Sequence, residues 1–230
     1  MPPLTDKRLI ISQLNPKSPI AEAYVRLRTN IELSAVDRPI QVIMLTSANP
    51  GEGKSTTVSN LAVVFAQADK KTLVIDADLR KPTIHHFFKV SNRSGLTNVL
   101  TKQISVQGAV RDTSLENLQV LTSGPIPPNP SELLSSQRMK ALIEELREAY
   151  DVIIIDTPPS LAVSDSQIIS TLSDGALMVL NSGSVKREMV IKAKANLEHA
   201  KARILGVVLN NMDRKNADAY YYYYYGEKEN

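Results

Sequence analysis

Short apolar runs alternate along the chain with longer segments in which apolar residues recur every three or four positions. A short run is typical of a buried strand, and a longer periodic segment is typical of a helix that covers a sheet. The runs predict strands over residues 40–46, 72–75, 117–122, 151–156, 175–180 and 204–209. The periodic segments predict helices over residues 19–34, 54–68, 131–150, 164–173 and 186–201, with short helices over 83–88 and 96–100. This alternation predicts an α/β fold with a mostly parallel central sheet and helices on both faces.

The two ends of the chain do not follow this alternation. Residues 1–18 are polar and interrupted by prolines, which predicts an extended arm. After Asp213 the apolar pattern stops, and six consecutive tyrosines follow, Tyr220–Tyr225. A packed strand or helix would not need six identical neighbours, so we expect residues 214–230 to form a flexible tail that extends on the order of 50 Å. The chain is therefore predicted to be a single domain over residues 1–213 followed by this tail.

A glycine-bearing loop, residues 48–56, separates the first predicted strand from the helix after it. It reads ANPGEGKST and fits G-x-x-x-x-G-K-[ST], except that Ala48 stands at the first glycine position. Gly51 and Gly53 allow backbone N–H groups to turn towards phosphate oxygens, and the helix that begins at Lys54 adds its dipole at the same place. A strand, this loop and a helix together predict a phosphate-binding loop, and hence a P-loop NTPase fold.

The side chains of this loop predict how a nucleotide is held. Lys54 is expected to reach the β- and γ-phosphates, and the Ser55 hydroxyl is expected to ligate Mg²⁺. The predicted ATP contacts within the loop are Pro50, Gly51, Glu52, Gly53, Lys54, Ser55 and Thr56.

Carboxylates follow two of the other predicted strands. Asp76 and Asp78 come directly after the strand 72–75, and Asp156 ends the apolar run 151–156. In open α/β sheets, ligands bind beyond the carboxyl ends of the strands, where these side chains are expected to meet. Asp156 resembles a Walker B carboxylate, which holds Mg²⁺ directly or through water. Ser55, Asp78 and Asp156 are therefore the predicted magnesium ligands.

Composition excludes several other functions. The 230 residues carry a net charge of only +3, which gives no general reason to expect a nucleic-acid partner. There are no cysteines, so disulfides, thiolate metal sites and iron–sulfur clusters are excluded. The longest apolar runs are about six residues, far below the roughly 20 that span a bilayer, and the first residues lack the apolar core of a signal peptide. A cytoplasmic location is the expectation.

The predicted helix 19–34 has an apolar face and a charged face. The apolar face is formed by Ile20, Ala23, Tyr24, Leu27 and Ile31. The charged face contains Glu22, Arg26 and Arg28, which allow two interpretations. It is either a solvated surface with a Glu22–Arg26 pair, worth a few tenths of a kcal/mol, or a contact between subunits.

Four motifs together give the chain a family resemblance. They are PGEGKST at 50–56, VIDADLRKP at 74–82, GPIPPNPSELL at 124–134 and IIIDTPP at 153–159, and the terminal tyrosine cluster completes the set. On these motifs the chain resembles the bacterial tyrosine kinases of capsule and exopolysaccharide synthesis, over nearly its whole length. It is similar to the stand-alone, cytoplasmic kinases in which the membrane partner is a separate protein.

The resemblance implies a tyrosine kinase that uses Mg-ATP to phosphorylate its own terminal cluster, mostly between subunits, and so regulates polysaccharide synthesis or export. Lys54, Asp76 and Asp78 match the family's catalytic residues, Asn210 matches the position where related ATPases read adenine, and Tyr220, Tyr221, Tyr222, Tyr223, Tyr224 and Tyr225 are the implied phosphoacceptors. The implied partners are a membrane-anchored activator with a cytoplasmic segment, other copies of the chain and a tyrosine phosphatase. The enzyme would lie at the inner face of the membrane through its activator.

The chain departs from the family in its oligomerisation motif. The pattern E-x-x-R-x-x-R begins at Glu22 and ends at Arg28, but Val25 replaces the middle arginine. Arg26 is one residue out of register, about 100° around a helix. A ring-shaped oligomer is implied by the family, but this substitution weakens the implication.

The chemistry of these residues is consistent with phosphoryl transfer to a phenol. A tyrosine hydroxyl has a pKa of about 10 and must lose its proton as it reacts; Asp76 is the expected base or metal-linked orienting group. The alternatives are a switch ATPase of the chromosome-partition or division-site type, which would carry a lysine at Asn49, and a non-catalytic ATP-binding adaptor.

Overall fold

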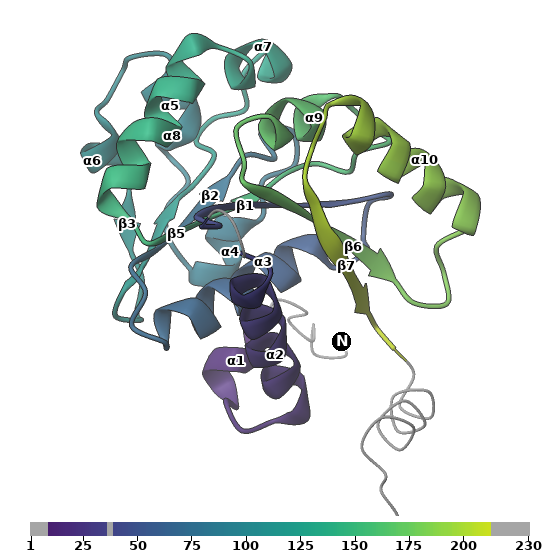
Figure 1. Cartoon of the computed structure of the whole chain (residues 1–230). Coiled ribbons are helices and arrows are strands. Elements are labelled where there is room, and N and C mark those ends of the chain that lie inside the picture. The colour runs from purple at the N-terminus through teal and green to yellow at the C-terminus, as the bar shows by residue number, and fades with distance from the viewer. Residues whose placement is uncertain (1–8, 36–38, 213–230) are drawn as a thin grey trace, which may run out of the picture.

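The computed structural model describes residues 9–35 and 39–212, and these form one seven-stranded sheet with helices on both faces (Figure 1). The strands are β1 (Val42–Ser47), β2 (Thr72–Asp76), β3 (Arg111–Asp112), β4 (Leu118–Leu121), β5 (Val152–Asp156), β6 (Gly175–Asn181) and β7 (Ile204–Asn210). Their spatial order is β3-β4-β2-β5-β1-β6-β7, and only the β3–β4 pair is antiparallel. The predicted α/β fold with a mostly parallel sheet is confirmed.

The helices pack in two layers, with α1–α4 on one face of the sheet and α5–α10 on the other (Figure 1). They are α1 (Ile11–Leu14), α2 (Pro19–Leu33), α3 (Lys54–Ala66), α4 (Ile84–Phe88), α5 (Leu96–Leu100), α6 (Val106–Ala109), α7 (Pro130–Leu134), α8 (Gln137–Ala149), α9 (Asp165–Ser170) and α10 (Arg187–His199). The central strands β1, β2 and β5 are buried along their whole length because each of their two faces is covered by a helix layer. On β1, for example, Ile43 and Leu45 pack against the α3 layer, whereas Met44 packs against the opposite layer.

The predicted extended arm is wrong over its second half. Residues 11–14 form the short helix α1, which packs on α3. Ile10 and Ser12 are buried, and the Ser12 backbone N–H donates to Asn60 Oδ1 at 2.9 Å. Apolar residues at this end find a surface on the P-loop helix, which the polar and proline-rich composition concealed. Residues 1–8 lie outside the described residues.

The predicted helix 131–150 is two helices. The first, α7, ends at Leu134, and the second, α8, begins at Gln137. Ser136 separates them because its hydroxyl accepts a hydrogen bond from the Met139 N–H at 3.2 Å and so caps α8. Serine is favoured at such caps over helix interiors. Helix α6 and the two-residue strand β3 were also not predicted.

Helix α2 is confirmed, but its contact face differs from the predicted one. Ala21 and Ile31 are its buried residues, whereas Ile20 and Ala23 are exposed. Arg28 donates to the Val64 carbonyl of α3 at 2.8 Å and lies 3.8 Å from Glu32. The ion pair found on this helix is therefore Arg28–Glu32 and not Glu22–Arg26, because Arg28 turns towards the P-loop helix.

The cover of the sheet is incomplete at one edge. On β7 the side chains of Val207 and Leu209 are about half exposed, at 50% and 55%. The expectation of helices over both faces therefore holds for the central strands but not for this edge strand. Among the described residues, no helix combines the length and the hydropathy needed to cross a membrane.

Candidate functional site

The strand order explains why distant motifs meet. Strand β5 lies between β1 and β2, so the loop after β1 and the ends of β2 and β5 are neighbours at the carboxyl edge of the sheet. Asp76 and Asp156 are register partners on adjacent parallel strands. The sequence prediction that the phosphate loop and the carboxylates share one edge is met by this geometry.

The P-loop has the backbone that its glycines permit. Gly51 and Gly53 lie in the left-handed region, with φ of +81° and +89°, where a side chain would be strained. A Cβ on Gly53 would also lie 1.8 Å from Asn210 Nδ2. The Asn210 amide donates to the Glu52 carbonyl at 3.1 Å. Asn210, at the end of β7, therefore lies directly against the loop to which the sequence assigned ATP.

The Glu52 side chain stabilises the loop by accepting hydrogen bonds from the backbone of the same loop. It is buried, and its Oε2 accepts hydrogen bonds from the N–H groups of Ala48 at 2.8 Å and Asn49 at 3.0 Å. Ala48 itself is buried in the cluster that packs α10 on the sheet. The sequence predicted Glu52 as an ATP contact and missed this side-chain role, since no periodicity signals a carboxylate bound to its own loop.

Lys54, Ser55 and Asp156 form the polar centre of the site. The Lys54 Nζ lies 2.5 Å from Asp156 Oδ1, and the Ser55 hydroxyl donates to Asp156 Oδ2 at 2.6 Å. Asp156 is fully buried, and Lys54 is 8% exposed. The lysine therefore neutralises a carboxylate that burial alone would make costly.

Asp76 is also fully buried, behind the polar centre. Its Oδ2 accepts the backbone N–H groups of Thr83 at 3.1 Å and Ile84 at 3.0 Å. Burial, followed by repulsion from Asp156, raises the pKa of Asp76 well above its usual value, although the Ile84 N–H and Lys54 oppose the rise. Two carboxylates on neighbouring strand ends, with one lysine between them, are an electrostatic arrangement typical of functional sites.

Asp78 differs from Asp76 because it faces open space. It is 8% exposed and lines the cavity beside the P-loop. Burial raises its pKa, and Lys54 and the N–H groups of Lys81 and Arg80 act in the opposite direction. The Lys81 N–H donates to Asp78 Oδ1 at 3.0 Å.

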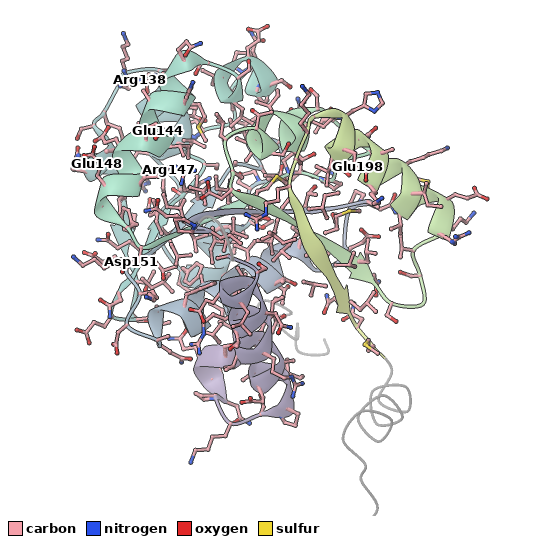
Figure 2. All side chains as sticks on the ribbon, in the orientation of Figure 1. Arg138, Glu144, Arg147, Glu148, Asp151 and Glu198 are labelled. Carbon is pink, nitrogen blue, oxygen red and sulfur yellow. The ribbon has the colours of Figure 1, made fainter. Side chains whose placement is uncertain are left out.

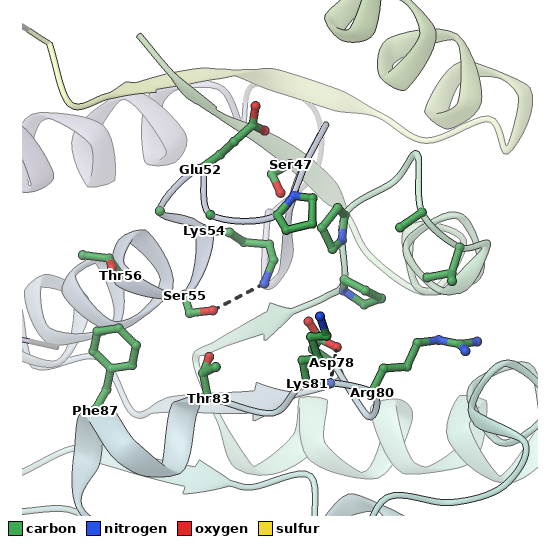
Figure 3. A pocket seen from close by; sticks show the side chains of 17 residues that line it. Ser47, Glu52, Lys54, Ser55, Thr56, Asp78, Arg80, Lys81, Thr83 and Phe87 are labelled. Carbon is green, nitrogen blue, oxygen red and sulfur yellow. Dashed lines mark hydrogen bonds between the residues drawn. The ribbon is translucent and has the colours of Figure 1, made fainter. Parts of the chain in front are cut away.

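A cavity of about 480 Å³ lies against these residues (Figure 3). All the loop residues predicted to contact ATP, Pro50 to Thr56, line it together with Asp78. Asp76, Asp156 and Asn210 do not line it and lie behind or beside its walls. The lining residues that the sequence prediction missed include Arg80, Lys81, Thr83, Phe87, Pro158 and Pro159. Their signal was their position, since they follow Asp78 and Asp156 at the same edge of the sheet.

The described residues contain no group of three or more His, Cys, Asp or Glu side chains that could hold a metal by themselves. Mg²⁺ does not need one, because it commonly keeps water and phosphate ligands and takes only one or two protein oxygens. The Ser55 hydroxyl and the Asp156 carboxylate are adjacent hard oxygen donors beside the phosphate loop, so this site fits Mg²⁺. The tyrosine cluster, Tyr220–Tyr225, lies outside the described residues.

Comparison with known proteins identifies the family. A family model described as AAA domain matches residues 40–204. Over 224 residues the chain is 51% identical to tyrosine-protein kinase YwqD of Bacillus subtilis strain 168. The alignment covers 97% of this chain and 94% of the relative. This chain belongs to the bacterial tyrosine-protein kinases.

Two further comparisons place the kinase within that family. It is 41% identical over 229 residues to the putative tyrosine-protein kinase CapB of Staphylococcus aureus, which covers 97% of this chain and all of the relative. The crystal structure of the chimerical protein CapA2B2 matches with a TM-score of 0.86 at 44% identity, over 89% of this chain and 90% of that one. The family resemblance predicted from the motifs is thus confirmed, and among the alternatives left open by the sequence the kinase is the one supported.

Proposed function

We propose that this kinase transfers the γ-phosphate of ATP to the tyrosines of its own terminal cluster, Tyr220–Tyr225, and that each copy mainly modifies a neighbouring copy. The observation that supports this most directly is the cavity beside the P-loop. Lys54 and Asp78 both line this cavity, at the carboxyl edge of the sheet. A cavity open to solvent can admit a tyrosine from another chain next to a bound nucleotide. The phosphorylation state of the tail would then regulate capsular or extracellular polysaccharide synthesis or export.

The nucleotide end of the reaction is assigned to the P-loop. Its N–H groups and the amino end of α3 bind phosphate oxygens, and Lys54 pairs with the β- and γ-phosphates. Asn210 contacts the loop backbone and extends the site towards the base of the nucleotide. When Mg²⁺ is bound, Ser55 and Asp156 hold it, and it neutralises charge on the phosphates.

The acceptor end of the reaction is assigned to the carboxylates. The phenolic oxygen forms a bond to the γ-phosphorus, the bond to the β,γ-bridging oxygen breaks, and the phenolic proton must pass to a base. The sequence assigned that proton to Asp76, but Asp78 is the one of the pair that lines the cavity. We therefore assign proton acceptance to Asp78, and we assign to Asp76 the orientation of the loop through the Thr83 and Ile84 N–H groups. This division also leaves magnesium to Ser55 and Asp156.

The proposed partners follow from the family. We propose a membrane-anchored activator that binds the kinase through a cytoplasmic segment, homo-oligomers that present tails to neighbouring sites, and a tyrosine phosphatase that resets them. The kinase would then be cytoplasmic and held at the inner face of the membrane by its activator. A relative whose structure was solved as the chimera CapA2B2 supports a search for such a partner. The small net charge gives no support for a nucleic-acid partner.

The acceptor assignment is tested by changing Tyr220–Tyr225 to phenylalanine. The variant is incubated with Mg-ATP, with and without a cytoplasmic peptide of the activator, and its intact mass is measured. We expect nucleotide binding to be preserved and nearly all mass increments of 80 Da, one per phosphate, to be lost. Full-strength labelling of this variant would show that the acceptors lie elsewhere.

Transfer between subunits is tested by mixing two inactive chains. Lys54→Met keeps the tail but loses the phosphate counter-charge, and the six-phenylalanine variant keeps the site but loses the acceptors. Each alone should remain unlabelled, whereas the mixture should label the Lys54→Met chain at a rate that rises with concentration. A mixture that stays unlabelled while the wild type labels itself would show that each chain modifies only its own tail.

A further inference from the structure

We propose that Arg80, Asp165 and Ser131 form a positioning cluster that holds Asp78 in place for phosphoryl transfer. This inference rests on the proposed role of Asp78 and extends it to three residues from separate segments. Arg80 belongs to the turn after β2, Ser131 to α7 and Asp165 to the first turn of α9.

The cluster is closed by mutual hydrogen bonds. The Arg80 guanidinium donates from Nε to Asp165 Oδ2 at 2.9 Å and from Nη2 to Asp165 Oδ1 at 3.2 Å. Arg80 Nη2 also donates to the Ser131 hydroxyl at 3.0 Å, and that hydroxyl donates to Asp165 Oδ1 at 2.6 Å. Each member contacts both others, so the side chain of Arg80 has little freedom to turn.

The burial of this cluster points to a specific purpose. The Asp165 side chain is fully buried, whereas that of Arg80 is 38% exposed and lines the cavity. Burial of a carboxylate costs several kcal/mol before its partners are counted, and an ion pair seldom stabilises a fold more than apolar residues of the same size would. The bidentate Arg80–Asp165 pair lies beside a cavity. Its role is better explained by the position that it imposes on neighbouring groups than by the stability that it adds to the fold.

The geometry that it imposes is that of Asp78. The carboxylate of Asp78 accepts the Lys81 N–H at 3.0 Å, and the Arg80 N–H also lowers its pKa. Both N–H groups belong to the turn whose side-chain anchor is Arg80. The direction of these two donors depends on the turn, and the turn is held from outside by Asp165 and Ser131. Loss of the anchor would let the Asp78 carboxylate rotate or shift within the cavity.

The orientation of Arg80 argues against a direct role on phosphate. Figure 3 shows its side chain extending away from Lys54 and Ser55, although it starts from the same turn as Asp78. Nε and Nη2 are already engaged by Asp165 and Ser131. We therefore treat Arg80 as a positioning residue and not as a catalytic one.

The test compares Arg80→Ala, Arg80→Lys and Asp165→Asn with a matched control, Arg147→Ala. Arg147 makes the same kind of bidentate pair with Asp174, at 2.8 and 2.9 Å, but far from the cavity. Full-length protein is incubated with Mg-ATP, and the maximal self-labelling rate and the half-saturating ATP concentration are measured separately, below the melting temperature of every variant.

We expect Arg80→Ala to lower the maximal rate about 10-fold or more, since misplacement of about 1 Å can cost 10²-fold, while the half-saturating ATP concentration changes less than about 3-fold. Arg80→Lys, which keeps the charge but not the fork, should recover part of the rate. Asp165→Asn should resemble Arg80→Ala, and Arg147→Ala should keep the wild-type rate. Equal effects of Arg80→Ala and Arg147→Ala, or an effect of Arg80→Ala confined to ATP saturation, would overturn the proposal.

A double substitution separates this inference from the function on which it rests. If Arg80 acts through Asp78, adding Arg80→Ala to Asp78→Asn should change the residual rate, followed over hours by intact mass, less than about 2-fold. A further full loss in the double variant would refute the positioning role but leave the proposed function standing. A wild-type rate for Asp78→Asn alone would instead remove the proposed role of Asp78.

Hydrogen exchange gives a second, structural measurement that does not depend on the rate. The Lys81 N–H donates to Asp78 in the wild type, and this hydrogen bond should slow its exchange. We expect it to exchange faster in Arg80→Ala and to be unchanged in Arg147→Ala. Unaltered protection in Arg80→Ala would contradict the proposal.

Discussion

The two ends of the parallel sheet carry similar charged residues in opposite electrostatic states. At the amino end of the strands, Arg147 of α8 and Asp174 before β6 form a fully paired network (Figure 2 shows Arg147 on its helix). At the carboxyl end, Asp76 and Asp156 share one lysine, Lys54. The first arrangement stabilises the fold, and the second costs stability.

The amino end shows what a stabilising network looks like. Asp174 accepts two hydrogen bonds from Arg147 and also the N–H groups of Val42 and Gln41, at 2.7 and 3.0 Å. Burial raises the pKa of Asp174, but the arginine and the two N–H groups together outweigh it, so its pKa is lowered. Both carboxylate oxygens of Asp174 accept hydrogen bonds, and Asp174 thereby connects α8 to the start of β1.

The carboxyl end shows the reverse. Burial and the neighbouring Asp156 raise the pKa of Asp76, because the Ile84 N–H and Lys54 compensate its charged form only in part. Sites of this kind are maintained for function at a cost in stability, which is the general pattern of catalytic centres.

The largest effect is expected from Lys54→Met. Removing the Lys54 ammonium takes away the counter-charge for the transferred phosphate, and we expect labelling to fall by about 10³-fold or more. Phosphotyrosine is measured by intact mass against the wild type, with circular dichroism as the folding control. Unchanged labelling would remove the P-loop from the mechanism.

The next largest effect is expected from Asp76→Asn, which should move activity and stability in opposite directions. Labelling should fall about 10²-fold because the Thr83 and Ile84 N–H groups lose their charged acceptor, and the loop that they belong to loses its alignment. The nucleotide-free protein should nevertheless melt at a higher temperature near neutral pH, since a costly buried charge is gone.

The pH dependence gives the sign of this stability effect. The pKa of Asp76 is raised, so folding takes up a proton there; the stability that this supplies is complete below the unfolded value of 3.8 and is lost as the pH rises through the raised folded value. Melting temperatures measured from acid to neutral pH should therefore decline more steeply in the wild type than in Asp76→Asn. If the melting temperatures of the wild type and Asp76→Asn changed with pH in the same way, the pKa of Asp76 would not be raised by folding.

A smaller effect is expected from Glu52→Ala. The N–H groups of Ala48 and Asn49 would lose their acceptor, which costs about 1–3 kcal/mol, and the loosened loop should bind ATP about 10-fold more weakly. Glu52→Gln keeps an acceptor oxygen and should change ATP affinity only about 2- to 3-fold. Calorimetric titration with ATP compares Glu52→Ala with Glu52→Gln. Equal ATP affinities would show that the hydrogen bonds accepted by the Glu52 side chain do not hold the loop in its binding conformation.

The smallest effect on activity is expected at the amino end. Arg147→Ala should lower stability by about 1–3 kcal/mol, with each kcal/mol equivalent to about 2–4 °C in melting temperature, and should leave the labelling rate unchanged. The pKa of Asp174 is lowered, so its contribution is complete above the unfolded value of 3.8 and is lost as the pH falls through the lower folded value. If Arg147→Ala lost labelling rate but kept its stability, the amino end of the sheet would serve activity and not stability, contrary to the comparison.

The sequence by itself determined the type of fold and the chemistry of the centre. Apolar runs ending in Asp76 and Asp156, and a glycine-bearing loop ending in Lys54, identify strand ends and a phosphate loop because the loop lies between a predicted strand and a predicted helix. Local rules also placed most helices. They failed where packing decided the outcome, as at Ser136, where one predicted helix is two, and at Ile10, which is buried on α3.

Only the tertiary structure decided which partners these residues meet. Ser131 lies 51 residues after Arg80 along the chain, and Asp165 lies 85 residues after it, so no local pattern could join them. The strand order β4-β2-β5 places the segments that follow these three strands side by side at one edge of the sheet, and those segments carry Ser131, Arg80 and Asp165. It also buries Asp76 while leaving Asp78 at the cavity, although the two differ by only two positions. Burial and pairing depend on the neighbours that folding brings together, and these determine which carboxylate can react.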